Sequence, residues 1–382
     1  MEREELGSWL RLTLTPGVGN ETARKLLMAF GSPEAVFQQS AIALRQVVHS
    51  TQVAALCAQP AELAALLDLT WNWLQESGIG SAQRQIMVLG DADYPASLLR
   101  IDDPPLMLYL LGAGKIASNT MIAIVGSRNP TPQGAANARH FSRALAQAGL
   151  TVVSGLALGI DGAAHEGALD SIEAGSKKLA TLAVVGTGLD RVYPKNHLDL
   201  AHRIARNGLL ISEYPLGTPP LTANFPRRNR LIAGLAQGTL VIEAALRSGS
   251  LITARLSAEQ GKDVFAIPGS IHSTQARGCH ALIKQGAKLV ESVQDVLEEM
   301  KIETESAISM ASRVAIEAAA DLVETQPSLL ETLGFDPVGL DALQARSGTD
   351  TARLQAQLMA LELDGLVARL PGGLFQRLVV HS

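Results

Sequence analysis

The stretch Met121-Ile122-Ala123-Ile124-Val125-Gly126-Ser127-Arg128 joins a short, wholly apolar run to a glycine, and a helical pattern opens at Thr131. Runs that are apolar throughout are typical of strands covered by helices on both faces. Further runs of this kind are Leu150–Val153, Leu179–Val185, Leu209–Ser212, Thr239–Ile242, Asp263–Ile267 and Lys288–Val290. Longer helical patterns separate them, so residues 85–300 predict an α/β fold with a doubly wound parallel sheet. Ile86–Leu89 and Leu106–Leu111 predict two extra short strands ahead of it.

Different patterns flank this middle block on both sides. Residues up to about 75 have helical apolar spacing, punctuated by turns at Pro16-Gly17-Val18-Gly19 and Gly31-Ser32-Pro33. The end of the chain shows three helical patterns and then a hairpin, which together are typical of a winged helix; they are Leu322–Thr332, Gly339–Ser347, Asp350–Asp364, Leu366–Leu370 and Leu374–Val380. We therefore expect a helical domain at 1–75, a sheet domain at 76–300, a linker at 301–321 and a winged-helix domain at 322–382.

Composition limits the function classes. The chain has 382 residues, with 32 Lys and Arg against 37 Asp and Glu, which gives a net charge of −5. This balance excludes a surface that is basic all over, but a local basic cleft remains possible. Only 4% of residues are aromatic, which argues against a long array of base-stacking rings.

The sequence also predicts the compartment. Its two cysteines, Cys57 and Cys279, fit a reducing environment. The acidic start, Met1–Glu5, is unlike a signal peptide, and the apolar runs are far shorter than the ~20 residues needed to span a bilayer. We expect a cytoplasmic protein with no membrane contact.

The turn Gly126-Ser127-Arg128 follows the first strand of the middle block. A glycine there lets a ligand approach the backbone, the amides of the following helix attract phosphate, and Arg128 could bind phosphate oxygens with its guanidinium. The spacing is not the G-x-G-x-x-G of dinucleotide sites. A tight turn with a surface arginine fits the same residues equally well.

Two further glycine-rich turns end strands, at Ser154-Gly155-Leu156 through Gly159-Ile160-Asp161 and at Gly186-Thr187-Gly188-Leu189-Asp190. Asp161 and His165 are four apart on a helix, yet no companion ligand completes a metal site, so we predict no metal. The sequence has no Walker loop and no G-x-S-x-G elbow. We therefore predict neither catalytic residues nor a cofactor.

The block Asn224-Phe225-Pro226-Arg227-Arg228-Asn229-Arg230 is the sharpest local signal. Three arginines beside an aromatic ring precede a helical run; guanidinium groups match phosphate oxygens, and a ring can stack on a base. Arg247-Ser248-Gly249-Ser250 and Thr253 follow the strand Thr239–Ile242 and add hydroxyls, amides and another cation. A solvated charged face is the alternative, but the basic clustering within an acidic protein favours binding.

Taken in order, these motifs resemble the DNA processing protein A (Smf) family over residues 85–300. The matching stretches include those above together with Tyr193-Pro194, Glu213, Ser248–Ala254 and Ala266-Ile267-Pro268-Gly269-Ser270. The outer blocks are similar to that family's N-terminal SAM-like or helix-hairpin-helix domain and its C-terminal winged helix. The sequence departs from the family pattern at Leu158, where an arginine is usual, and at Gly278-Cys279-His280, where Gly-Thr-Asn is usual.

The resemblance implies a protein that binds single-stranded DNA without sequence preference, is not an enzyme, and loads the RecA recombinase during natural transformation. It implies an extended Rossmann domain that forms a homodimer. The residues it assigns to single-stranded DNA are Gly126, Ser127, Arg128, Asn224, Phe225, Pro226, Arg227, Arg228, Asn229, Arg230, Ser248, Gly249, Ser250 and Thr253. How the arginines divide between DNA and the fold is left open, and one of them could pair with Glu213 or Glu243.

Two other functions fit parts of the sequence. The glycine-rich turns and Gly238-Thr239…Glu243 distantly resemble nucleoside-monophosphate phosphoribohydrolases, in which Glu243 or Asp161 could act near a ribose. The arginine block is not expected of such an enzyme. An adaptor whose outer domains dock proteins is the third hypothesis. The winged helix has few basic residues on its expected recognition helix, which favours protein contact over duplex recognition.

Overall fold

The computed structural model describes residues 1–76, 82–116, 120–172, 179–302 and 329–378. The chain forms two compact units. The first comprises Met1–Ala123, Val153–Leu156 and Ile172–Gln237; the second comprises Ile124–Val152, Ala157–Ser171 and Gly238–Ser382.

The first unit begins with a group of short helices. They are α1 (Arg3–Leu14), α2 (Asn20–Phe30), α3 (Pro33–Phe37), α4 (Ala41–Leu44), α5 (Ser50–Cys57) and α6 (Leu63–Gln75). Their apolar faces bury Leu6, Leu10, Leu26 and Leu56 in one core. The turn expected at Gly31-Ser32-Pro33 starts α3, because the Ser32 hydroxyl accepts the amide of Ala35 and Pro33 occupies the first turn.

A nine-stranded sheet follows, in the order β1-β2-β6-β5-β4-β3-β7-β8-β9. The strands are β1 (Gln83–Val88), β2 (Met107–Gly112), β3 (Met121–Val125), β4 (Thr151–Ser154), β5 (Thr181–Val184), β6 (Leu209–Ser212), β7 (Gly238–Val241), β8 (Asp263–Ala266) and β9 (Lys288–Leu289). β1 pairs antiparallel with β2, and β2 pairs antiparallel with β6. The pairs β5–β6, β7–β8 and β8–β9 are parallel.

The strand order reverses at β3. From β3 the chain proceeds through β4, β5 and β6 in one direction, and it then returns to the other side of β3 with β7, β8 and β9. In open α/β sheets, ligands bind at the carboxyl ends of the strands beside such a reversal. The turn after β3 and the turn after β7 are therefore the first places to look for a site.

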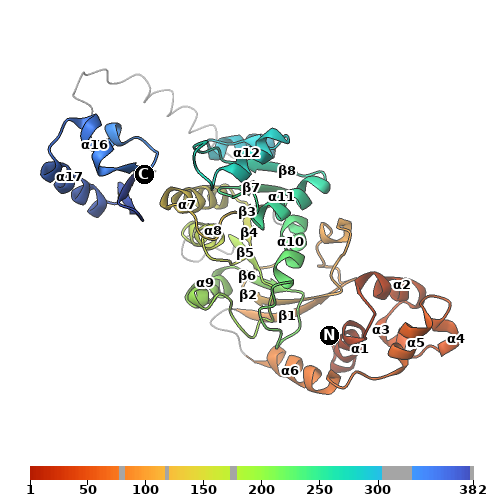
Figure 1. Cartoon of the computed structure of the whole chain (residues 1–382). Helices are drawn as coiled ribbons and strands as arrows, with labels where there is room; N and C mark the ends of the chain where they lie inside the picture. Colours follow the sequence, from red (N-terminus) through yellow and green to blue (C-terminus); the bar gives the residue numbers. More distant parts are fainter. Residues whose placement is uncertain (77–81, 117–119, 173–178, 303–328, 379–382) are drawn as a thin grey trace. The chain divides into compact units, whose positions relative to one another are not determined.

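Helices cover both faces of the sheet (Figure 1). They are α7 (Pro132–Gln147), α8 (Ile160–Leu169), α9 (Leu198–Asn207), α10 (Asn224–Leu235), α11 (Ser250–Glu259), α12 (Arg277–Lys284) and α13 (Val293–Glu299). In the first unit α9 and α10 lie on opposite sides of β5, and in the second α7 and α11 lie on opposite sides of β7 (Figure 1). The predicted doubly wound architecture is confirmed.

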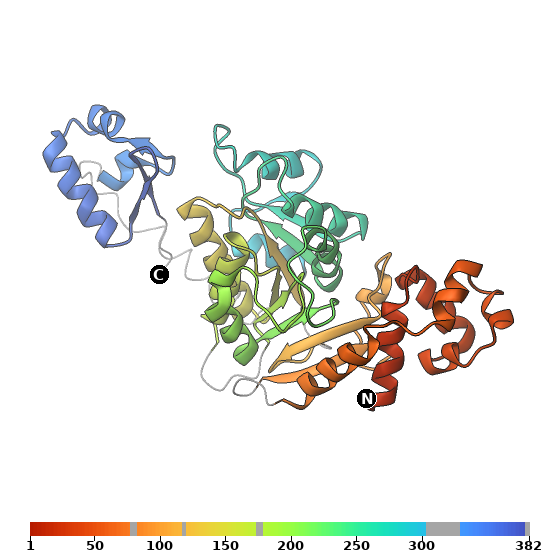
Figure 2. The ribbon, with the colours of Figure 1, turned by 60° about the horizontal axis from the view of Figure 1, so that its bottom comes forward.

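The C-terminal domain contains α15 (Leu329–Leu333), β10 (Val338–Gly339), α16 (Leu340–Ser347), α17 (Thr351–Leu363), β11 (Val367–Leu370) and β12 (Leu374–Arg377). Its sheet has the order β10-β12-β11. Figure 2 shows this domain, in blue, as helices packed beside a hairpin. Leu333, Leu343, Leu354, Leu358 and Phe375 form its core. The winged-helix prediction is confirmed, with the short strand β10 added to the expected hairpin.

Two predictions from the sequence, the linker and the first helix of the winged-helix domain, fall partly outside the described residues. The linker expected at 301–321 is described only at Lys301 and Ile302, and the helix expected at Leu322–Thr332 is described only from Leu329, where it is α15. Among the described helices, none has both the length and the apolar character needed to cross a bilayer.

Candidate nucleic-acid interface

In the second unit, the turn after β3 is built around Gly126. Its neighbour Ser127 donates its amide to the carbonyl of Glu243 at 2.6 Å and accepts the amide of Ile160 at 3.0 Å. A Cβ on Gly126 would lie 2.6 Å from Cγ1 of Ile160 and 2.9 Å from the Glu243 carbonyl oxygen. Glycine is required here because three chain segments meet, which is a reason independent of any ligand.

Gly159, at the start of α8, packs against the same turn. Its φ of +81° suits glycine, and an added Cβ would collide with the carbonyl groups of Ser127 and Arg128. The backbone of the turn is thus fixed on two sides, by Gly159 and by Glu243. This fixed turn presents the side chain of Arg128 at the surface, where it is exposed.

Glu243, just beyond β7, forms hydrogen bonds with the start of α7. Its carboxylate accepts the hydroxyl of Thr131 at 2.6 Å and the amide of Thr131 at 2.9 Å. The Thr131 hydroxyl in turn accepts the amide of Gly134 at 3.0 Å and so caps α7. Burial raises the pKa of Glu243 above its ordinary value, and the Thr131 contacts act against that rise.

The turn before α11 buries most of its polar groups. Ser248 and Ser250 share a hydrogen bond of 2.7 Å between their hydroxyls, and Ser250 and Thr253 are buried, with exposed fractions of 9% and 1%. Gly249 is exposed, as is Arg247. The hydroxyls therefore order the start of α11, and Gly249 and Arg247 form the accessible part of this turn.

In the first unit, the turn after β5 contacts the start of α10. Asn224 is buried and donates its side-chain amide to the carbonyl of Gly186 at 3.1 Å. The ring of Phe225 lies beside Gly186, where a Cβ would be 3.3 Å from it. Phe225 also packs on Tyr193 with ring centroids 5.5 Å apart and planes inclined by 39°. Tyr193 is 47% exposed, so this aromatic pair reaches the surface.

The arginines of the basic block lie inside α10 rather than ahead of it, since the helix begins at Asn224. Arg228 is buried, with 4% of its surface exposed. It donates hydrogen bonds to the carbonyls of Gly155, at 2.5 Å, and of Val184, and to the side chain of Asn229 at 3.1 Å. Arg228 therefore ties α10 to the ends of β4 and β5.

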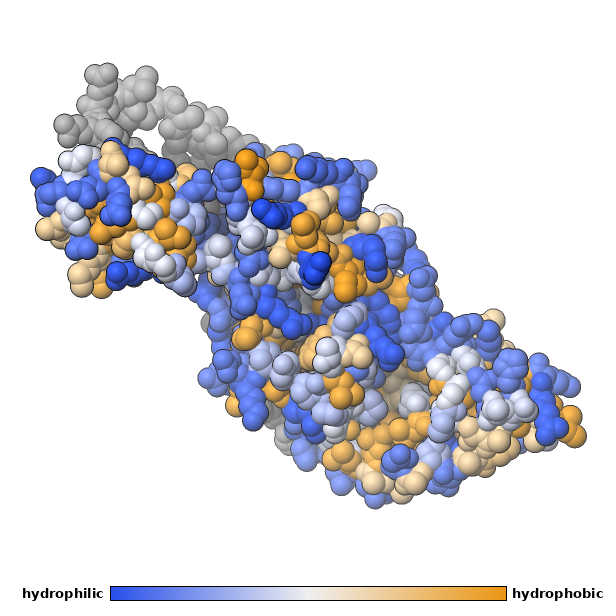
Figure 3. All heavy atoms as spheres, viewed as in Figure 1, coloured by the Kyte–Doolittle hydropathy of each residue, from blue (hydrophilic) through white to orange (hydrophobic). Residues whose placement is uncertain are grey.

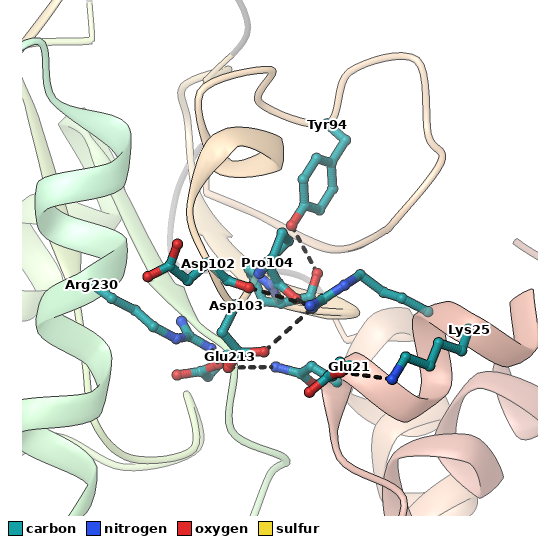
Figure 4. A network of polar contacts seen from close by, with 11 residues as sticks. Glu21, Lys25, Tyr94, Asp102, Asp103, Pro104, Glu213 and Arg230 are labelled. Atoms are coloured by element: carbon teal, nitrogen blue, oxygen red, sulfur yellow. Dashed lines mark hydrogen bonds and ion pairs between the residues drawn. The ribbon is translucent and has the colours of Figure 1, made fainter. Parts of the chain in front are cut away.

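Arg230 belongs to a charged network that converges on Asp103 (Figure 4). It pairs with Glu213, which follows β6, and with Asp103 at 3.2 Å. Asp103 also accepts hydrogen bonds from Arg24 of α2 at 3.3 Å and from Asn20 at 3.1 Å. Burial raises the pKa of Glu213, and the neighbouring charge of Arg230 opposes that rise. This network joins α10 to the N-terminal helices, in line with the open possibility that one arginine pairs with Glu213.

The fourteen residues of the expected interface thus differ in accessibility. Exposed are Arg128, Pro226, Arg227 and Gly249; half-buried are Gly126, Phe225, Asn229, Arg230 and Ser248; buried are Ser127, Asn224, Arg228, Ser250 and Thr253. Residues 126–128 and 248–253 belong to the second unit, and residues 224–230 belong to the first.

Two residues that contact the predicted interface residues were not assigned to the interface from the sequence. Sequence reasoning singled out Tyr193 only as part of a motif, although an aromatic beside a proline after a glycine-rich turn is a usable signal. It did not consider Asp103, whose role depends on contacts that no local pattern encodes.

The two departures from the family pattern have different surroundings. Leu158 is 41% exposed. Gly278 packs so closely on Ala244 that a Cβ would lie 2.8 Å from the Ala244 side chain, and Cys279 is fully buried. Burial raises the pKa of the Cys279 thiol to about 12, so it stays protonated. Within the described residues, no cluster of three or more His, Cys, Asp or Glu could hold a metal ion.

Two family models match parts of this chain. Residues 85–301 match the model of the family described as DNA recombination-mediator protein A, and residues 315–373 match that of the DprA winged helix domain. Protein Smf of Escherichia coli is 40% identical over 282 residues, which cover 73% of this chain and 74% of that protein. Protein Smf of Synechocystis is 32% identical and covers 99% of this chain and 100% of its own length.

Solved structures of DNA processing protein A also resemble this chain. The X-ray structure of DNA processing protein A from Streptococcus pneumoniae superposes with a TM-score of 0.65 at 36% identity, over 80% of this chain and 99% of that one. DNA processing protein A from Helicobacter pylori, whose structure concerns its single-stranded DNA binding mode, gives a TM-score of 0.50 at 32% identity, over 56% and 95%. The chain is therefore a member of the DNA recombination-mediator protein A family, also called DprA or Smf, of DNA processing proteins.

Proposed function

We propose that this protein binds single-stranded DNA without sequence preference, protects it, and loads the RecA recombinase onto it in natural transformation and recombination. The observation that carries the proposal is an exposed cation and an accessible aromatic ring in the first turn of α10. Arg227 is exposed there, and the ring of Phe225 packs on half-exposed Tyr193. Cations bind the phosphate backbone and rings stack on any base, so this chemistry reads no sequence.

The second unit adds Arg128, held at the surface by a fixed backbone turn. Because the backbone that carries Arg128 is already fixed, binding of a phosphate costs little backbone entropy. The buried members of the expected interface, such as Arg228 and Asn224, act by shaping the turns that present the exposed ones. We assign the DNA contacts to Arg128, Phe225 and Arg227.

The family supports the rest of the proposal. The Helicobacter pylori relative is described by its binding of single-stranded DNA. We extend that binding to this chain, and with it RecA as protein partner, a homodimer formed through the Rossmann domain, a cytoplasmic location and the absence of enzymatic activity. We also propose the domain limits 1–75, 76–300, 301–321 and 322–382.

A phosphoribohydrolase is the competing function, and the geometry does not favour it. The carboxylate of Glu243, a candidate for action near a ribose, is occupied by the hydroxyl and amide of Thr131. Asp161, the other candidate, is buried and accepts the amide of Ala157 at 3.3 Å. Release of free base from nucleoside monophosphates would support the enzyme, and its absence at high protein concentration would support the binding protein.

The proposal is tested by fluorescence anisotropy with a labelled thymidine oligonucleotide over a salt titration. Arg227→Glu and Arg128→Glu should each weaken binding about tenfold or more, since a charge-assisted contact contributes about 1.5–3 kcal/mol. Loss of one phosphate contact should also reduce the salt slope by about 0.7. Arg45→Glu, a reversal at an exposed arginine beside α4, is the matched control.

Unchanged affinity and slope in both variants, with the fold intact by circular dichroism, would show that the interface lies elsewhere. RecA loading is measured separately, as the lag before RecA assembles on single strands already coated with a single-strand-binding protein. The wild type should shorten this lag, and Arg227→Glu should not. No effect of the wild type on the lag would refute the loading role and leave the binding role standing.

A further inference from the structure

Helix α17 (Thr351–Leu363) of the winged-helix domain has two apolar faces. One face packs Leu354, Leu358 and Leu361 into the domain core. The other carries Ala352, Ala356, Met359 and Leu363, which are all exposed. At about 100° per residue, the second set lies on the side of the helix opposite the core. An amphipathic helix normally carries polar residues on that side.

The exposure of this outer face is large. Met359 is 65% exposed and Leu363 is 82% exposed. Apolar residues also reach the surface of the winged-helix domain in the view of Figure 3. The helix carries only two charged residues, Arg353 and Glu362. In winged helices the third helix is the one that enters the DNA groove, where Arg, Lys, Asn and Gln make the contacts. The aliphatic outer face of α17 is suited instead to protein contact.

The arrangement of large and small residues on this face is complementary to itself. If a second copy of α17 lies antiparallel, with its midpoint between Gln357 and Leu358, then Met359 of each copy faces Ala356 of the other. In the same register Leu363 of each copy faces Ala352 of the other. Each large side chain then meets an alanine, which lets the two helices approach closely and fill the space between them.

The charged residues beside this face also favour the antiparallel arrangement. Arg353 and Asp364, the residue that ends α17, are both exposed and lie on the same side of the stripe by helical periodicity. In the antiparallel pair, Arg353 of each copy comes next to Asp364 of the other, which gives two opposite-charge contacts. A parallel pair would set this flank beside the opposite flank of the partner, which brings Asp364 close to Glu362, and such a like-charge contact is unfavourable.

We propose that the outer face of α17 is a self-association surface, through which the winged-helix domains of two copies pair antiparallel. This is a second interface, distinct from any dimer formed by the Rossmann domain. The outer face of this 13-residue helix is only about 20 Å long, so it buries much less area than the ~800 Å² per partner of a stable interface, and the contact is weak alone. It becomes effective where copies are already held near one another.

Cysteine crosslinking of the full chain tests both the contact and its direction. Exposed Cys57 is first replaced by Ser; Cys279 is buried and stays. One preparation then carries Ala352→Cys and another carries Leu363→Cys. In the antiparallel pair these two positions are adjacent, whereas the two copies of residue 352 are about 16 Å apart, too far for a disulfide. Under mild oxidation, we expect disulfide-linked dimers in the mixture and not in either variant alone.

The control mixture pairs Leu363→Cys with Arg346→Cys, which places an exposed cysteine on α16 instead. Dimers that form equally fast in this control would overturn the proposal, because they would report random collision. Dimers of Ala352→Cys alone would overturn the antiparallel arrangement. All variants are checked for folding by circular dichroism, and the substituted positions lie outside the domain core.

A charge exchange provides a second readout. Arg353→Asp on the Ala352→Cys chain should slow crosslinking to the Leu363→Cys chain, because the introduced carboxylate would then face Asp364. Adding Asp364→Arg to the Leu363→Cys chain should restore the rate, since both flanking pairs are again of opposite charge. A rate that ignores these changes, or failure of the second change to restore it, would show that something other than this antiparallel pair is being trapped.

Discussion

Arg228 and Gly155 are fitted to one another. The guanidinium Nη1 of Arg228 donates to the Gly155 carbonyl at 2.5 Å, and a Cβ on Gly155 would overlap that guanidinium. The residue that looks like a flexible ligand-binding glycine is thus small because a buried arginine lies against it. Its neighbour Leu156 has a φ of +58°, an uncommon conformation for a bulky residue, and its carbonyl lies 3.0 Å from Nδ1 of His197.

Replacing Arg228 should therefore lower the stability of the folded protein, and its effect should not be limited to DNA binding. Arg228→Met removes the buried hydrogen bonds that the guanidinium donates to the carbonyls of Gly155 and Val184, and we expect a loss of about 3 kcal/mol in the free energy of unfolding. Urea denaturation followed by circular dichroism measures it. Arg227→Ala, the adjacent exposed arginine, is the matched control and should change stability by at most about 0.5 kcal/mol. Equal effects at the two positions would contradict the division of roles within α10.

The charged network around Arg230 predicts how strongly different substitutions should lower the free energy of unfolding. Arg230→Met leaves the buried carboxylate of Glu213 without its partner, which should cost about 3–5 kcal/mol. Asp103→Asn affects a carboxylate that is 46% exposed and should cost about 1 kcal/mol or less. The double change Arg230→Met with Glu213→Met should recover much of the loss, because no charge stays buried. Urea denaturation of the wild type, these three variants and Glu213→Met alone checks this, and additive losses at 213 and 230 would contradict it.

The sequence predicted the sheet better than it predicted the site. Predominantly apolar runs located Met121–Val125 and Leu209–Ser212 to the residue, because central strands are covered on both faces. The run Leu179–Val185 overestimated β5 (Thr181–Val184), since its flanking residues are buried without belonging to the strand. Apolarity reports burial, whereas strand ends depend on hydrogen bonds.

The arginines of α10 show why the site was harder to predict. Their order alone does not separate Arg227 from Arg228, but the helical spacing of Asn224, Arg228, Leu231 and Leu235 marks one buried stripe. Placing the helix start at Asn224 would have assigned Arg228 to the interior. The partners of Arg230 could not have been found this way, because Asp103 is 127 residues away in sequence.

The aromatic pair leads to a prediction about DNA affinity, which depends on the proposed function. Phe225→Leu removes a ring that could stack on a base, and the expected loss is about 1–3 kcal/mol of binding free energy, or roughly 5- to 150-fold in Kd. Anisotropy with a thymidine oligonucleotide measures it. Tyr193→Phe keeps a ring and should bind within about twofold of the wild type. An unchanged Kd in Phe225→Leu would remove stacking at this position from the mechanism.

Glu243 makes stability depend on pH. Burial raises its pKa in the folded chain above the ordinary 4.5, so the unfolded chain loses this proton at a lower pH than the folded chain does. The contribution of Glu243 to the free energy of unfolding therefore falls as the pH rises from about 4.5 through the folded-state pKa, and it is constant above that. Glu243→Gln keeps the shape and can still contact the amide and hydroxyl of Thr131, but it does not titrate. Urea denaturation from about pH 4 to about pH 8 should show an advantage of the Gln variant that grows with pH and then levels off. Parallel curves for the two proteins would mean that the carboxylate at the start of α7 is as well solvated folded as unfolded.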